Sequence, residues 1–248
     1  MLEVLGRNYS RNIESVRAFE IGNTFMQNLM DPEGLPIESD AMSVGIYGKD
    51  NDFFTLKGMI TELLSKLGVR DVEFTAEREY GTYHPGRCAR ILTREKVTGR
   101  NPEEAEWVEL GIMGEFHPDV TEKYGIGTRC CGAELMLNVI TEMADMEKVY
   151  YPLPKYPATS RDIALVVDEE MTVGEIQKVI RKAGGKLLKK IELFDVYRGA
   201  QVGEGKKSVS FTVSLRASDR TLTDTEADNA VKKILKSIEH ELGVTLRS

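Results

Sequence analysis

The chain has 248 residues, of which 41% are hydrophobic and 29% charged, a composition that suits one or two globular domains with a substantial core. No stretch approaches 18 consecutive apolar residues, and the three cysteines provide no disulfide framework, so the sequence argues against a membrane-spanning protein and a disulfide-rich secreted one. Residues 1–150 carry 16 Lys and Arg against 26 Asp and Glu, whereas residues 151–248 carry 17 against 14. We therefore expect that only the C-terminal part could meet a polyanion, the simpler alternative being two ordinary solvated surfaces.

The first 150 residues predict an α+β layer. An amphipathic helix is expected over Phe53–Leu67, because Leu56, Ile60 and Leu64 recur on one face, and a short helix is expected over Pro118–Tyr124. Strands are expected, in chain order, at Ser15–Met26, Ala41–Tyr47, Val72–Ala76, Cys88–Thr93, Trp107–Glu115 and Ala133–Ile140. Strands interrupted by few helices are typical of an antiparallel sheet with helices packed against it.

A domain boundary is expected near residue 150, because Tyr150–Pro157 contains three of the eight prolines. Proline fixes φ, removes a backbone donor and favours an extended conformation in the residue before it. The segment therefore predicts an extended linker between a domain at residues 1–149 and a second domain at residues 156–248.

The second domain predicts a regular alternation of strands and helices. In chain order we expect a strand at Asp162–Asp168, a helix opened by the Thr172–Glu175 capping box and closed by Gly184 and Gly185, a strand at Leu188–Tyr197, a hairpin loop at Gly199–Gly205, a strand at Ser208–Leu215, a helix from the Thr223–Glu226 capping box to Gly243, and a last strand at Val244–Arg247. The order βαββαβ predicts a ferredoxin-like sandwich, with two helices on one side of a four-stranded antiparallel sheet. The other face of the sheet is then open.

The strand at Ser208–Leu215 alternates strictly between apolar and polar residues, which predicts that Ser208 and Ser210 lie on the open face. Asp195 and Tyr197 share one face of the preceding strand. The functional interpretation places both beside Ser208, where a carboxylate accepts from a base amino group, a tyrosine stacks on a base and a serine does either. The structural alternative is that Asp195 closes a turn or accepts from a nearby backbone N–H.

One difficulty attends the functional interpretation. Ile191 and Leu193 have the same parity as Asp195 and Tyr197. Either the open face is partly apolar, or a β-bulge near Phe194 changes the register of the strand.

The sequence offers little support for catalysis or metal binding. The three histidines form no metal-ligand motif, and His84 and His117 precede prolines, as in turns and helix starts. Cys88 lies in a predicted strand and is expected in the core, and no nucleophile elbow is present. The glycine-rich Gly199–Gly205 segment lies between two strands, so it lacks the helix N-terminus of a phosphate-binding loop. We expect no catalytic residue and no metal site, and, without a signal peptide or disulfides, a cytoplasmic location.

Several segments carry a resemblance to a known family. In the C-terminal part they are Lys155–Val167, Leu193–Tyr197, Gly205–Ser208 and Arg220–Asp224, which closely resemble the ferredoxin-fold anticodon-binding domain that ends the β subunit of bacterial phenylalanyl-tRNA synthetases. Upstream they are Asn12–Phe25, Phe53–Gly58, Tyr83–Ala89 and Gly111–Pro118, which resemble the catalytic-like module of the same subunit. The two sets follow one another in the family's order.

The resemblance implies an inactive class II synthetase-like module followed by the anticodon-binding domain. In this family the α subunit binds ATP and phenylalanine within an (αβ)₂ assembly. The implied partners are therefore tRNA(Phe) and the α subunit, and neither DNA nor a membrane. Asp195, Tyr197 and Ser208 are the implied anticodon contacts, and Lys206 and Lys207 are expected to meet phosphates.

The resemblance also implies limits. The family's β subunit is much longer, and its N-terminal tRNA-binding and editing modules have no counterpart here, so we expect a C-terminal fragment without proofreading or independent aminoacylation. No cofactor is expected in this chain, since ATP and magnesium serve the complete enzyme. Two alternatives remain: an amino-acid-binding regulatory module of ferredoxin-like fold, and a pure scaffold for the α subunit.

Overall fold

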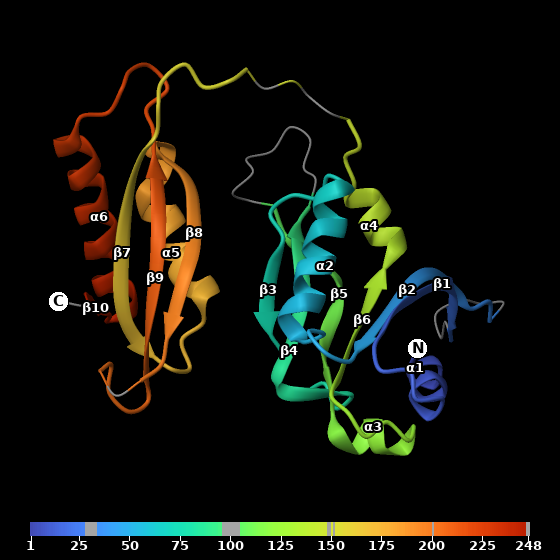
Figure 1. Ribbon diagram of the computed structural model, residues 1–248. Helices are drawn as coiled ribbons and strands as arrows, with labels where there is room; N and C mark the ends of the chain where they lie inside the picture. The colour runs from blue at the N-terminus through green and yellow to red at the C-terminus, as the bar shows by residue number, and fades with distance from the viewer. Residues whose placement is uncertain (28–33, 96–104, 148–149, 151, 200, 247–248) are drawn as a thin grey trace. The chain divides into compact units, whose positions relative to one another are not determined.

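The computed structural model describes the chain apart from residues 28–33, 96–104, 148–149, 151, 200 and 247–248 (Figure 1). Residues 1–149 and residues 150–248 form two compact units. Residues 152–157 of the predicted linker contain no helix or strand, and Tyr151 of that segment lies outside the described residues. No helix in the described part of the chain is long and apolar enough to cross a membrane.

The first unit is an antiparallel six-stranded sheet with helices, in agreement with the predicted α+β class. The order of strands in the sheet is β1-β2-β6-β5-β4-β3 (Figure 1). The elements are α1 Leu2–Ser10, β1 Val16–Met26, β2 Ile37–Tyr47, α2 Phe53–Lys66, β3 Glu73–Ala76, β4 Tyr83–Arg94, β5 Trp107–Phe116, α3 Pro118–Lys123, β6 Cys130–Met136 and α4 Leu137–Met143.

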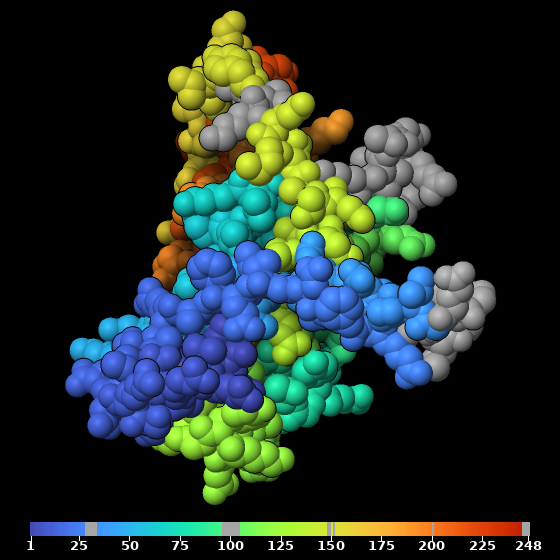
Figure 2. All heavy atoms as spheres, turned by 90° about the vertical axis from the view of Figure 1, so that its right-hand side faces the viewer, coloured from blue at the N-terminus to red at the C-terminus, as the bar shows by residue number. Residues whose placement is uncertain are grey.

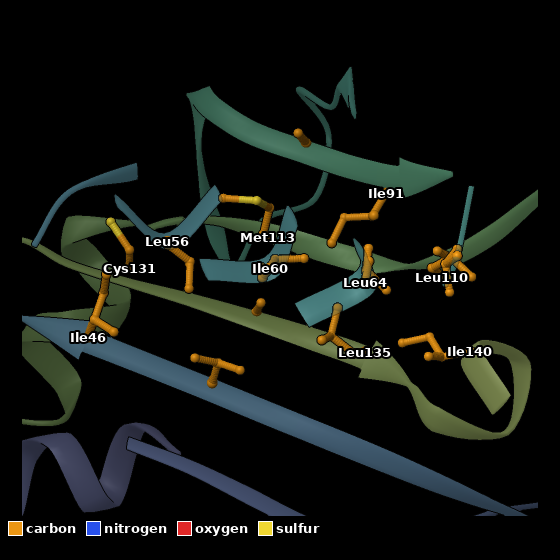
Figure 3. Close-up of a cluster of buried hydrophobic side chains, with 14 residues drawn as sticks. Ile46, Leu56, Ile60, Leu64, Ile91, Leu110, Met113, Cys131, Leu135 and Ile140 are labelled. Atoms are coloured by element: carbon orange, nitrogen blue, oxygen red, sulfur yellow. The ribbon is translucent and has the colours of Figure 1, made fainter. Parts of the chain in front are cut away.

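The core of the first unit lies between α2 and the sheet. Leu56, Ile60 and Leu64 of α2 are buried, as the helical periodicity predicted, and they pack with Ile46 and Leu135 from the sheet (Figure 3). The helix begins where the Asp52 side chain accepts a hydrogen bond from the Thr55 N–H at 2.7 Å, which satisfies one backbone donor of the first turn.

Two features of the first unit differ from the sequence prediction. The predicted strand Ala133–Ile140 is wrong in its second half, because β6 ends at Met136 and α4 follows immediately. Ile140 is buried and Leu137 packs against the same core, and this three-residue spacing suits one face of a helix. Helix α1 was not predicted, although its Leu5 is fully buried against Tyr47 and Ile126.

The second unit is a four-stranded antiparallel sheet in the order β10-β7-β9-β8. Its elements are β7 Thr159–Asp168, α5 Val173–Gly184, the 3₁₀ turn η2 Gly185–Leu187, β8 Leu188–Tyr197, β9 Lys206–Leu215, α6 Asp224–Leu242 and β10 Thr245–Leu246. Both predicted capping boxes, which begin at Thr172 and Thr223, are confirmed. Arg247 of the predicted last strand lies outside the described residues.

Candidate RNA-binding face

The sheet of the second unit is covered by helices on one face. Ile176 of α5 and Ile234 of α6 are fully buried with Val209 and Phe211 of β9, so both helices pack on the face that carries the apolar residues of this strand (Figure 1). Alternate residues of a strand point to opposite faces, so Ser208 lies on the face away from the helices. The alternation read from the sequence is therefore confirmed.

The register of the sheet brings the predicted site residues together. Tyr197 of β8 lies directly opposite Ser208 of β9, and Asp195 lies opposite Ser210. Residues directly opposite each other on neighbouring strands point to the same face. Asp195, Tyr197 and Ser208 therefore share the open face.

A β-bulge in β8 explains how this register arises. Leu193 pairs with Phe211, whereas Asp195 pairs with Ser210. Two residue steps along β8 therefore correspond to one step along β9. The extra residue, Phe194, changes the parity of the strand. Leu193 consequently pairs on the core side, while Asp195 lies on the open side. Of the two alternatives left open by the sequence, the bulge is the observed one.

The accessible part of this site is the edge strand β8. Asp195 is exposed, and the Tyr197 side chain is 37% exposed. The Tyr197 ring folds back towards the following loop, where a Cβ added to Gly199 would overlap its hydroxyl group. Gly199, which the sequence analysis treated only as part of a hairpin loop, therefore leaves the space that the ring occupies.

Two of the predicted contact residues are buried. Ser208 is 0% exposed, because its short side chain lies on a central strand between Val166 and Tyr197. Lys207 is 7% exposed, and its Nζ donates to the Glu169 carbonyl oxygen at 2.6 Å. Both side chains are thus held within the fold in this structure, and their contact with RNA stays a prediction.

The cations that remain accessible are held in exposed ion pairs. Lys206 Nζ lies 3.6 Å from an Asp168 carboxylate oxygen, and Arg198 Nε donates to Glu169 Oε1 at 2.8 Å. Ion pairs between exposed side chains contribute only about 0–1 kcal/mol. Both cations can therefore exchange their carboxylate partner for a phosphate at little cost. Arg198 was not among the residues singled out from the sequence.

The sheet of the first unit has one face filled by its own side chains. Gly45, Gly132 and Gly114 stand side by side on β2, β6 and β5. A Cβ added to Gly132 would overlap the Phe116 ring, and one added to Gly114 would come within 2.8 Å of the Tyr83 ring. The rings of Tyr83 and Phe116 stack on each other over Gly114 and Gly132 with centroids 5.1 Å apart, and Gly45 faces Met1 and Leu5.

The hollow next to these rings is small. Its volume is about 250 Å³, and its lining includes Ser43, Tyr83 and Glu134. Ligand pockets typically enclose roughly 300–1,000 Å³. The stacked rings thus occupy much of the space that a ligand would need on this face of the sheet.

A buried carboxylate in the first unit is held by two arginines. Glu115 is 5% exposed; Arg129 donates to both of its oxygens at 3.0 and 2.6 Å, and Arg87 donates to Oε1 at 3.0 Å. Burial raises the pKa of Glu115, but the hydrogen bonds from Arg129 and the positive charges of both arginines outweigh it, so the pKa lies below its ordinary value of 4.5. Glu115 and Arg129 also line a hollow of about 570 Å³, where the guanidinium and the carboxylate are hydrogen-bonded to each other.

This cluster predicts an acid-sensitive contribution to stability. Because the folded pKa of Glu115 is lowered, its stabilising effect is fully present above pH 4.5 and is lost as the pH falls through the folded value. Glu115→Gln should therefore lower the urea midpoint of the first unit at pH 7 and differ less from the wild type in acid. Trp107, the single tryptophan, reports this unit by fluorescence. The exposed Glu122→Gln provides the control, and an equal loss in both variants would contradict this role of Glu115.

Neither thiol nor metal chemistry is prominent in the described residues. Burial raises the pKa of Cys88 to about 11 and those of Cys130 and Cys131 to about 12, so the thiols stay protonated and are poor nucleophiles at neutral pH. His84 and His117 accept backbone N–H groups of Gly86 and Asp119. His117 caps the start of α3, as predicted, whereas His84 lies within β4. No three His, Cys, Asp or Glu side chains gather as metal ligands within the described ranges.

Comparison with known proteins matches both units. Residues 1–137 match the family described as the phenylalanyl tRNA synthetase beta chain CLM domain, and residues 154–247 match the ferredoxin-fold anticodon binding domain. The second match does not favour the alternative of an amino-acid-binding regulatory module.

Curated relatives agree with the family matches. The phenylalanine–tRNA ligase beta subunit of Clostridium tetani is 40% identical over 247 residues, covering 100% of this chain and 30% of the relative. The beta subunit of Clostridium acetobutylicum is 40% identical over 247 residues and is covered to 29%, and that of Bacillus subtilis is 34% identical over 259 residues and is covered to 30%. The chain thus spans about a third of the length of these relatives. By its sequence along both units, it belongs to the phenylalanyl-tRNA synthetase beta-chain family.

Proposed function

We propose that the second unit binds the anticodon loop of tRNA(Phe) and that the first unit supports a catalytic α subunit without catalysing aminoacylation itself. The observation that carries the proposal is the open face of β8, where an exposed carboxylate and an aromatic ring lie within a matched anticodon-binding domain. On this proposal the second unit has the βαββαβ plan, and the first is a class II synthetase-like module whose ligand face is filled by Tyr83 and Phe116.

The chemistry of the face suits a single-stranded RNA loop. An anticodon loop offers unpaired bases, which bind proteins by stacking on aromatic rings and by hydrogen bonds along the base edges. The Tyr197 ring supplies the stacking surface, and the Asp195 carboxylate accepts from a base amino group. Lys206 and Arg198 lie on either side of the adjoining hairpin and supply positive charge for phosphates, which makes the binding salt-dependent.

Replacing Tyr197 by alanine should weaken binding of tRNA(Phe) to the assembled enzyme by about 1–3 kcal/mol, because a stacked base loses its aromatic partner. The measurement is the tRNA dissociation constant at fixed salt. Tyr197→Phe keeps the ring and should bind nearly as well as the wild type. Tyr150→Ala removes a tyrosine that is 82% exposed and lies outside the sheet, so it serves as the matched control.

The same experiment identifies the role of the neighbouring carboxylate. Asp195→Asn should reduce discrimination between tRNA(Phe) and anticodon variants, while Lys206→Ala should weaken all tRNAs alike. If Tyr197→Ala leaves both the affinity and the anticodon discrimination unchanged, the assignment of this face is wrong.

The supporting role of the first unit rests on its edge strand. Strand β1 pairs only with β2 in the described sheet, and Phe19, Ile21 and Phe25 on one of its faces are 66%, 60% and 62% exposed. Figure 2 shows the side chains of β1, in blue, on the surface of this unit. A long apolar edge strand that is left open is a ready site for another chain.

The double substitution Phe19→Ser and Phe25→Ser should therefore weaken association with the α subunit by roughly tenfold or more, because two aromatic side chains lose their buried contacts. Co-purification and a titration by light scattering measure the effect. Phe54→Ser on α2 removes an aromatic residue that is 74% exposed and should leave the association unchanged. Equal weakening by Phe54→Ser would place the contact elsewhere.

A further inference from the structure

The bulge in β8 leaves an aromatic side chain outside the core. Phe194 is the residue without a direct partner in the register between Leu193 and Asp195, and it is 58% exposed. Without the bulge, Phe194 would share the parity of Val196, which pairs with the fully buried Val209 on the helix side. The bulge therefore takes Phe194 out of the paired register, and its aromatic side chain is left exposed on the edge strand.

Protection of the sheet edge does not explain this arrangement. Bulges, lysines, prolines and charges at an edge strand discourage pairing with other chains. Here the bulge instead presents Phe194 together with Leu193, which is 41% exposed, and Tyr197 follows three residues later. An exposed aromatic side chain on an edge strand is typical of a binding surface rather than of a protected edge.

We propose that Phe194 is a second base-stacking residue, so that β8 holds two unpaired bases, one on Phe194 and one on Tyr197, with Asp195 between them. This inference rests on the proposed binding of the anticodon loop. Phe194 and Tyr197 are three residues apart with the bulge between them, and both are exposed on the edge strand. Each ring can therefore offer its own stacking surface to an unpaired base.

The test compares three substitutions of Phe194 in the assembled enzyme, with unmodified tRNA(Phe) transcript and a transcript that lacks the anticodon arm. Phe194→Ala should weaken binding of the whole tRNA by about five- to 140-fold, the equivalent of about 1–3 kcal/mol for one stacked base. Phe194→Leu keeps apolar volume without an aromatic face and should lose nearly as much. Phe194→Trp should bind like the wild type, and none of the three should alter binding of the truncated transcript.

Leu193→Ala provides the matched control, since Leu193 is a partly exposed neighbour without an aromatic face. The inference is overturned if Phe194→Leu binds as well as the wild type, or if Phe194→Ala weakens both transcripts or the α-subunit association, because Phe194 would then make a protein contact. If Tyr197→Ala weakens tRNA binding and Phe194→Ala does not, this inference fails while the proposed function stands. If neither has an effect, the proposed function fails as well.

Discussion

Replacing Phe211 by alanine should lower the free energy of unfolding of the second unit by about 3–5 kcal/mol, because a fully buried aromatic side chain leaves a cavity that its neighbours fill only in part. Phe211 is 0% exposed at the centre of the sheet, between Ile163 of β7 and Leu193 of β8. The same strand carries Ser208 and Ser210 on the open face of the sheet. Loss of this core residue should therefore also abolish tRNA binding, although Phe211 itself faces the helices.

Amide hydrogen exchange, followed by mass spectrometry, measures the effect in each unit separately. In Phe211→Ala, the amides of β7, β8 and β9 should exchange much faster, while the urea transition reported by Trp107 in the first unit should be unchanged. Phe194→Ala provides the control on the adjacent strand, since substitution of an exposed residue normally changes stability by no more than about 0.5 kcal/mol. Similar losses in the two variants would contradict the assignment of Phe211 to the core and Phe194 to the surface.

Gly68→Ala should destabilise the first unit by about 2–5 kcal/mol, through backbone strain and steric overlap together. Gly68 follows helix α2 with φ +73°, a conformation that favours glycine. Its N–H donates to the Ser65 carbonyl and that of Val69 donates to the Leu64 carbonyl, which completes a Schellman motif. A Cβ at this position would also overlap the backbone carbonyl of Asp145, which cannot move as a side chain can.

The chain contains a matched control for this substitution. Gly125 ends α3 in the same motif, with its N–H donating to Glu122 and that of Ile126 donating to Thr121, and its φ is +68°. No atom lies within 4 Å of a Cβ placed there. Gly125→Ala should therefore lower the free energy of unfolding by about 1–2 kcal/mol, through backbone strain without steric overlap. The urea transition of Trp107 measures both variants, and equal losses would show that the Asp145 contact contributes nothing.

The second unit has two sets of residues with different expected roles. The helix-facing residues of β9, such as Phe211, decide whether the sheet forms, and the edge strand β8 decides what the sheet can bind. Among the described residues of β8, Phe194, Asp195 and Tyr197 are exposed, and Lys206 and Arg198 lie beside the adjoining hairpin. Substitutions of the helix-facing residues of β9 should reduce stability and binding together, whereas substitutions of the exposed residues of β8 should change binding alone.

The sequence by itself determined the features that depend on neighbouring residues. Capping boxes at Thr172 and Thr223 use side chains three residues apart, and the alternation of β9 follows from the pleat of a single strand. Their geometry is local, so both could be predicted without knowing the fold. The family resemblance likewise follows from the sequence alone, and with it the choice of Asp195 and Tyr197.

Only the tertiary structure decided which of these side chains are accessible. Ser208 and Lys207 have polar side chains typical of a surface, yet a central strand with neighbours on both sides buries the first and a contact with the Glu169 carbonyl buries the second. The bulge at Phe194 is a register shift between two strands, and the crowding at Gly68 comes from a segment more than seventy residues away. Burial, register and crowding are set by residues distant in the chain, and the local sequence does not contain them.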